Sequence, residues 1–258
     1  DPLVEAYMEA GVAAGYGHTD DYNGAQQEGF GRLQMTIRDG RRCSAATGYL
    51  RPALRRPDLT VEVKALATRI LFSGARATGV EYRKDGMTLV AEAEREVILA
   101  GGVINTPQLL MLSGIGDPAG LAEHGIPVKL ALPGVGRNLQ DHASTIVSYS
   151  RAGGGPFLSN MRLDRIVPTL ANAWLRGKGF AADIPGGVMA FVKSRPEVAL
   201  PDVQLILTTA PLGVGPYLPP FTPPFRDGFV SRVVMLRPES RGTVTLTSTT
   251  NDGGSGIA

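Results

Sequence analysis

The sequence predicts an α/β protein with α+β character, built from two parts that meet near residue 145. Three observations predict it: apolar residues at helical spacing over 3–14, strand-like runs over 59–100, and short alternating segments beyond residue 145. Helices bury apolar residues every three to four positions, whereas half-buried strands bury every second residue. We therefore expect two domains, residues 1–145 and residues 146–258.

The first part begins with local signals for two helices and a strand. Two glycines end the helical pattern over 3–14. Alternating apolar residues predict a short strand over 33–37, and Ser44 is placed to cap a helix over 45–54.

Residues 59–100 follow as a β-rich stretch. Alternation over 59–63 predicts one strand, and the apolar residues of 70–72 and 80–82 predict two more. Lys84, Asp85 and Gly86 form a hairpin-turn signal.

The most informative local pattern is an apolar run followed by two glycines and a helix start. Val97–Ala100 is a short continuous apolar run, which is typical of a central strand covered on both faces. Gly101 and Gly102 follow, and Thr106 and Pro107 fit the N-cap and first position of a helix. Such a turn aims backbone N–H groups at one point and suits a phosphate or dinucleotide, although an ordinary tight β–α turn explains the pattern equally well.

The second part alternates a helix with strands and an irregular loop. Residues 163–175 have helical spacing, and alternation predicts strands over 203–207, 230–236 and 244–246. Five prolines within 216–224 exclude regular structure there.

Composition excludes several classes of protein. The 258 residues carry 26 basic and 24 acidic side chains, a net charge of +2 that gives no reason to expect a nucleic-acid or membrane-surface partner. No apolar run approaches the ~18 residues that span a bilayer. The single cysteine, Cys43, excludes an internal disulfide and fits a reducing compartment such as the cytoplasm without establishing it. Three widely separated histidines show no metal-ligand spacing, so we expect no metal.

Two isolated motifs are weaker evidence for a phosphate or dinucleotide site than the glycine turn at 101–102. The pairs Arg41–Arg42 and Arg55–Arg56 could hold phosphate, with solvated surface arginines the safer interpretation. Gly114, Gly116 and Ala119 match a G-x-G-x-x-A pattern, but they follow a helix where a dinucleotide fingerprint follows a strand.

Several segments together resemble the glucose–methanol–choline (GMC) flavoprotein oxidoreductases. GVINTPQLLMLSGIG at 102–116 resembles the second signature of that family, LPGVGRNLQDH at 132–142 resembles a further motif, and LRPESRG at 236–242 a third. Shorter matches lie at 23–31, 36–46, 56–61 and 79–81. All of them occur in family order over residues 16–247, which makes the resemblance specific.

The resemblance implies part of an FAD-binding, Rossmann-like domain and part of an antiparallel-sheet substrate domain. It implies FAD as cofactor and places the following residues beside it: Ala67, Ala100, Gly101, Gly102, Thr106 and Pro107. Ala67 stands where the family usually has a valine whose backbone contacts the adenine. Val103 departs from the small residue usual at its position.

The resemblance also implies an internal fragment. The family's N-terminal dinucleotide fingerprint and C-terminal catalytic histidine have no counterpart here, so no catalytic residue is assigned and the chain alone is expected to be inactive. The parent enzyme would oxidise a small alcohol to an aldehyde or ketone by hydride transfer to flavin, with oxygen or a quinone or dye as electron acceptor. A hydroxynitrile-lyase-like, non-redox member and a non-catalytic scaffold stay as alternatives. Apolar faces that lose their usual cover could drive self-association.

Overall fold

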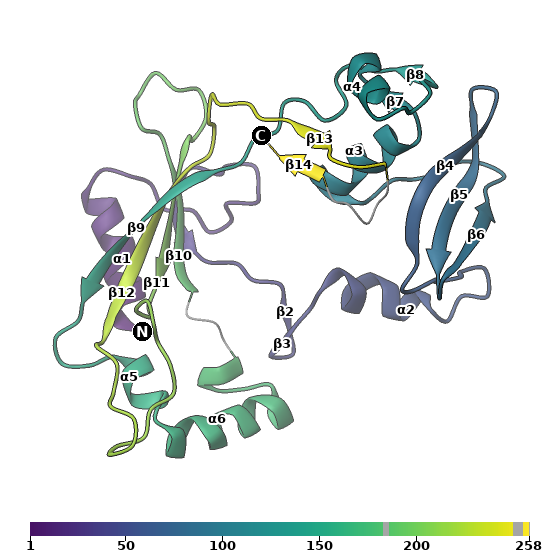
Figure 1. The fold of residues 1–258 in the computed structure, drawn as a ribbon. Coiled ribbons are helices and arrows are strands. Elements are labelled where there is room, and N and C mark those ends of the chain that lie inside the picture. Colours follow the sequence, from purple (N-terminus) through teal and green to yellow (C-terminus); the bar gives the residue numbers. More distant parts are fainter. Residues whose placement is uncertain (183–185, 250–254, 258) are drawn as a thin grey trace. The chain divides into compact units, whose positions relative to one another are not determined.

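The computed structural model describes residues 1–182, 186–249 and 255–257. By their contacts the residues group into two compact units (Figure 1). Unit 1 comprises residues 1–56 and 142–237, and unit 2 comprises residues 57–141 and 238–258. This grouping differs from the expected contiguous halves, because a strand within residues 1–56 hydrogen-bonds to a strand of the later segment.

Unit 1 is built on a five-stranded antiparallel sheet. Its strands, in spatial order, are β1 (Gly29–Arg32), β10 (Gly186–Val192), β11 (Val203–Thr208), β12 (Gly228–Met235) and β9 (Ala143–Ser150). The sequence prediction of an antiparallel sheet in the second part is confirmed, and β11 and β12 lie at the predicted positions.

Helix α1 (Pro2–Ala13) covers one face of this sheet and forms the core of unit 1. Alternate residues of β10 and β11 point toward the helix, as period-2 burial requires. The buried cluster consists of Val4, Met8, Phe30, Val188, Ala190, Val192 and Leu207. Gly11 permits the close approach, because a Cβ there would lie 2.6 Å from the Phe30 ring.

The remaining elements of unit 1 are short, apart from the 14-residue helix α6. They are β2 (Ile37–Arg38), β3 (Arg41–Arg42), the π-helical turn η1 (Ala46–Leu50), α2 (Arg51–Ala53), α5 (Pro156–Asn160), α6 (Leu163–Arg176) and the 3₁₀ turn η2 (Phe180–Ala182). The predicted helix over 163–175 is α6. The Ser44 hydroxyl accepts a hydrogen bond from the Thr47 amide at 3.3 Å, as a capping residue does. The predicted strand over 33–37 is wrong, because pairing stops at Arg32 and resumes at Ile37.

Unit 2 contains a three-stranded antiparallel sheet beside two helices. The sheet consists of β4 (Leu66–Ser73), β5 (Arg76–Lys84) and β6 (Met87–Glu92), in that order. The other elements are α3 (Gly102–Leu112), β7 (Ile115–Gly116), α4 (Pro118–Glu123), β8 (Leu130–Ala131), β13 (Val244–Leu246) and β14 (Ser255–Ile257). The predicted hairpin turn is present, with Asp85 and Gly86 both at positive φ.

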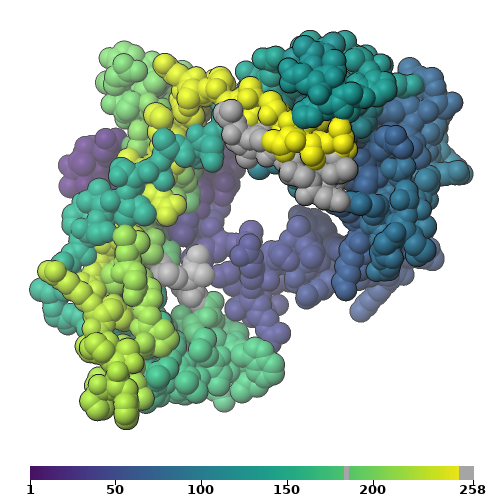
Figure 2. Space-filling model, in the orientation of Figure 1, coloured from purple at the N-terminus to yellow at the C-terminus, as the bar shows by residue number. Residues whose placement is uncertain are grey.

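The core of unit 2 joins the helices to the C-terminal strand. Met111 of α3, Leu121 of α4 and Leu246 of β13 are buried together. In the space-filling view, the yellow segment that contains β13 lies directly against the teal surface of α3 and α4 (Figure 2).

Two predicted strands of unit 2 are not strands. Within the described ranges, residues 59–63 and Val97–Ala100 pair with no other strand. The 97–100 run was expected to be central, and a central strand needs a hydrogen-bonded neighbour on each edge. The run has no such neighbour among the described residues and forms no regular structure, and Ile98 is 78% exposed.

Candidate functional site

A cavity of about 490 Å³ lies in unit 2 between β4, residues 97–101 and the first turns of α3. Its volume falls within the roughly 300–1,000 Å³ of small-molecule sites. The lining residues are Ala65, Leu66, Ala67, Val80, Val97, Ile98, Leu99, Ala100, Gly101, Asn105, Thr106, Gln108 and Leu109. Most of them are apolar, and none of these lining residues has an ionisable side chain.

Helix α3 forms one wall and begins earlier than the sequence indicated. Its N-cap is Gly101 and its first residue is Gly102, so the predicted start at Thr106 and Pro107 is wrong. Gly102 has a φ of +81°, which glycine adopts without steric cost. Pro107 lies inside the helix and cannot donate to the carbonyl of Val103, its usual intrahelical acceptor.

The first turn of α3 gives this wall its polarity. The first four N–H groups of a helix have no intrahelical acceptor, and the helix dipole makes this end positive. Gly101 keeps the turn tight, since a Cβ there would already lie 3.2 Å from the Cβ of Asn105 and 3.3 Å from the amide of Thr106.

Strand β4 forms the opposite wall. It is an edge strand of the three-stranded sheet, and Ala67 pairs with Tyr82 of β5 next to an irregularity in the register. The buried Ser113 hydroxyl, just after α3, accepts the Ile70 amide of β4 at 2.9 Å. This bond ties β4 to α3 and so fixes the separation of the two walls.

A carboxylate stiffens β4 beside the irregular register. The Thr68 hydroxyl donates to Glu81 at 2.8 Å, and the Arg69 guanidinium donates to the other carboxylate oxygen at 3.0 Å. The Thr68 hydrogen bond, followed by the Arg69 bond and its charge, lowers the pKa of Glu81 below its usual value. Glu81 therefore holds β4 to β5 in its ionised form.

The structure brings four of the six predicted cofactor residues to this cavity. Ala67, Ala100, Gly101 and Thr106 line it, whereas Gly102 and Pro107 do not. Sequence reasoning did not assign the other lining residues to the cofactor: Ala65, Leu66, Val80, Val97, Ile98, Leu99, Asn105, Gln108 and Leu109. Gly101, Asn105 and Gln108 follow one another at intervals of four and three residues, which places them on one face of a helix. A helix start at Gly102 would therefore have predicted that this face lines the cavity.

The lining fits part of a dinucleotide. Aliphatic side chains on two walls suit a flat aromatic ring, and the positive end of α3 suits an anionic group. The amides of Asn105 and Gln108 add both hydrogen-bond donors and acceptors. These residues can bind and orient such a group, and they offer no side chain for proton transfer at neutral pH.

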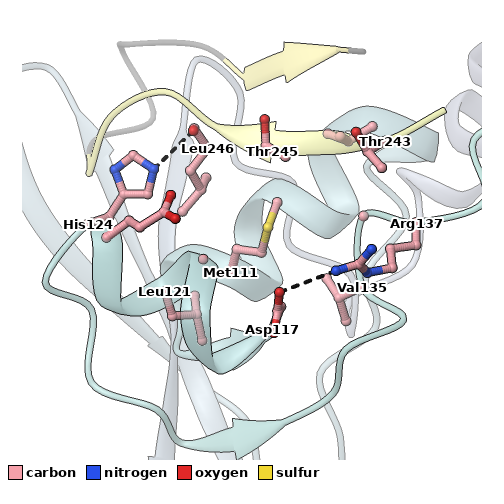
Figure 3. Close-up of a pocket in the computed structure, with 13 residues that line it drawn as sticks. Met111, Asp117, Leu121, His124, Val135, Arg137, Thr243, Thr245 and Leu246 are labelled. Atoms are coloured by element: carbon pink, nitrogen blue, oxygen red, sulfur yellow. Dashed lines mark hydrogen bonds and ion pairs between the residues drawn. The ribbon is translucent and has the colours of Figure 1, made fainter.

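A second cavity of unit 2, of about 310 Å³, is shown in Figure 3. Three of its polar side chains have protein partners: Arg137 pairs with Asp117 at 3.3 Å, and His124 Nε2 lies 3.0 Å from the carbonyl oxygen of Leu246. The carbonyl can only accept, so this contact as a hydrogen bond requires the proton on Nε2. The His124 contact holds the end of α4 against β13, the Arg137 pair holds a loop to the start of α4, and we assign the second cavity a structural role.

The described part of the chain contains neither a cluster of metal ligands nor a membrane-spanning helix. No three His, Cys, Asp or Glu side chains there gather as a metal site would require. No helix among those residues is both long and apolar enough to cross a membrane.

Comparison with known proteins identifies relatives over nearly the whole chain. The family model described as GMC oxidoreductase matches residues 1–144. The mitochondrial choline dehydrogenase of Mus musculus is 47% identical over 206 residues, covering 79% of this chain and 34% of that protein. The oxygen-dependent choline dehydrogenase of Brucella ovis is 42% identical over 249 residues, covering 96% of this chain and 44% of that protein.

Solved structures share the fold at low sequence identity. The pyridoxine 4-oxidase of Mesorbium loti superposes with a TM-score of 0.75 at 23% identity, over 100% of this chain and 46% of that one. A formate oxidase superposes with a TM-score of 0.80 at 22% identity, over 98% of this chain and 48% of that one. The chain thus spans less than half the length of each relative named here. The family model and the ordered motifs lead to one conclusion: this chain belongs to the GMC oxidoreductase family.

Proposed function

We propose that this chain supplies part of the FAD site of a flavoenzyme that oxidises a small alcohol to an aldehyde or ketone. The observation that carries the proposal is the cavity between β4 and the start of α3, which is lined by Ala67, Ala100, Gly101 and Thr106. It coincides with the segment that resembles the second family signature. FAD, when bound, supplies the hydride acceptor for this chemistry.

The chain's own share is binding and orientation. Unit 2 would hold the cofactor: the aliphatic walls exclude water from a flat ring, and the first turn of α3 faces an anionic group. Gly102 and Pro107 would act indirectly, by setting the start and course of α3. Unit 1, with its open antiparallel sheet, is assigned to the substrate side.

No catalytic residue is proposed within this chain. The lining of the cofactor cavity has no acid or base. The family resemblance implies a catalytic histidine that has no counterpart among the matched motifs. More than half of each choline dehydrogenase lies beyond the segment that matches this chain, which leaves room there for the catalytic residues. We therefore expect FAD binding without turnover from the 258 residues alone.

The experiment compares this chain with a longer polypeptide that adds the missing family segments. Anaerobic flavin absorbance is followed with a panel of alcohols that includes choline, since choline dehydrogenases are among the relatives. The longer protein should bleach with at least one alcohol, and the 258-residue chain should bleach with none. A folded, flavin-loaded longer protein that no alcohol reduces would contradict the redox proposal. Reoxidation by oxygen or by a quinone or dye then identifies the electron acceptor.

A further inference from the structure

Half of the residues that line a cavity of about 540 Å³ in unit 1 are arginines. Its residues come from the β2–β3 hairpin, from the η1–α2 segment and from the C-terminal end of α6, elements labelled in part in Figure 1. The charged lining consists of Arg38, Arg41, Arg42, Arg51 and Arg176, with Asp39 as the one acid. The whole chain has a net charge of only +2, so positive charge is concentrated at this cavity.

The framework of the cavity is a backbone-to-backbone contact. Gly40, in the hairpin turn, and Gly177, which ends α6, have φ values of +67° and +64°. A Cβ on Gly40 would overlap the carbonyl of Gly177, and a Cβ on Gly177 would overlap the carbonyl of Asp39. Only glycine fits at both positions, so the hairpin is fixed against the end of the helix.

One arginine completes this framework. The Arg41 guanidinium donates to the Trp174 carbonyl at 2.7 Å, in the last turn of α6. That end of a helix is negative and carries carbonyls without intrahelical donors. Arg41 is thus used to hold the hairpin to the helix.

The other four lining arginines make no ion pair that would hold the framework together, as the following observation shows for the described residues. In the portion of the chain that the structure describes, no carboxylate lies within ion-pair distance of the guanidinium groups of Arg38, Arg42, Arg51 or Arg176. Like charges around one concavity repel each other, and a concavity of one sign concentrates counter-ions. The planar guanidinium donates two parallel hydrogen bonds to phosphate oxygens.

We propose that this cavity binds the phosphate group of a small anionic ligand, for which inorganic phosphate and pyrophosphate are the simplest probes. Four arginine side chains that line one cavity match a multiply charged anion better than a singly charged carboxylate. The site lies within unit 1 and shares no residue with the proposed FAD cavity of unit 2. The inference therefore does not rest on the proposed function.

The first test measures phosphate and pyrophosphate binding to the 258-residue chain by titration calorimetry. The double variant Arg42→Gln with Arg51→Gln removes two lining charges, and Arg55→Gln removes an exposed arginine of the same segment that does not line the cavity. Pyrophosphate affinity should fall at least about tenfold in the double variant and stay unchanged in Arg55→Gln. Equal affinity in all three proteins, or no binding to the unaltered chain, would overturn the proposal.

The second test places the ligand. Cys43 is the only cysteine of the chain and lines this cavity, so its alkylation by neutral iodoacetamide reports on occupancy. Pyrophosphate should slow alkylation in the unaltered chain and in Arg55→Gln, and should have no effect in the double variant. Binding without protection would place the anion elsewhere and overturn the assignment.

If the double variant does not fold, the single variant Arg176→Gln takes its place in the test. It removes one lining charge at the exposed end of α6. It should weaken pyrophosphate binding while FAD binding stays as in the unaltered chain. Unchanged pyrophosphate affinity, or loss of FAD binding in parallel, contradicts an independent phosphate site.

Discussion

The Ser113 hydroxyl accepts the amide of Ile70 at 2.9 Å while it donates to the carbonyl of Leu109 at 2.6 Å. One buried side chain thus joins the edge strand of the three-stranded sheet to the end of α3. Because β4 and α3 form the two walls of the proposed cofactor cavity, this bridge sets the cavity's width.

Replacing this bridge should destabilise unit 2. Ser113→Ala leaves the buried Ile70 amide without its acceptor, which costs about 1–3 kcal/mol. Urea unfolding should show the loss, and amide exchange at Ile70 should accelerate. Ser73→Ala, at the exposed end of the same strand, should change neither quantity. Equal stability of Ser113→Ala and the unaltered chain would mean that the bridge is dispensable.

The pH dependence of unit 2 should include Glu81. Its pKa is lowered in the folded chain, chiefly by the Thr68 hydroxyl and then by Arg69. A carboxylate with a lowered folded pKa stabilises the fold above its unfolded pKa of about 4.3 and loses that contribution as the pH falls through the folded value. Unfolding measured between neutral and acidic pH should therefore be less pH-dependent in Glu81→Gln. An identical pH profile would rule out this contribution.

The packing of α1 on the sheet should depend on Gly11. A Cβ there would meet the Phe30 ring at 2.6 Å, so Gly11→Ala overpacks the core and should cost unit 1 about 1–3 kcal/mol. Gly120→Ala in α4 is the matched substitution, because a Cβ there meets nothing within 4 Å. It should be neutral or stabilise unit 2 by up to about 1 kcal/mol. Thermal unfolding of both variants distinguishes a steric effect from a general loss of glycine.

The exposed apolar run should promote self-association. Ile98 is 78% exposed in a segment that pairs with no strand in the described residues. Sedimentation velocity should show concentration-dependent association of the unaltered chain, and Ile98→Lys should weaken it. Met87→Lys, on another exposed apolar residue of unit 2, is the control and should leave association unchanged. Association that Ile98→Lys does not alter would place the contact elsewhere.

Local periodicity predicted much of the fold. The helix α6 and the strands β11 and β12 were readable because each carries its own apolar spacing. The predicted strand over 97–100 is wrong because continuous apolar character indicates a covered strand only if neighbouring strands are present. The start of α3 was misplaced because Thr106–Pro107 looks like a cap, whereas two preceding glycines begin the helix.

The two candidate sites also differ in how far the sequence predicts them. The six cofactor residues came from one family resemblance, and four of them line one cavity because they lie on adjoining segments. The arginine cavity combines the hairpin with Arg176, far along the chain, and depends on two glycines that meet backbone to backbone. No spacing in the sequence encodes that meeting, so the sequence indicates only the Arg41–Arg42 pair of this cavity, while Arg55 and Arg56 do not line it.

The central claim is that the cavity between β4 and α3 holds FAD, and its most direct test is FAD binding to the 258-residue chain. Ala100→Trp fills the cavity from an exposed position, and Ala91→Trp places the same side chain on β6, outside the lining. Equilibrium dialysis with FAD should show binding to the unaltered chain and to Ala91→Trp, with affinity reduced at least about tenfold in Ala100→Trp. Folded Ala100→Trp that binds FAD as tightly as the unaltered chain would contradict the claim.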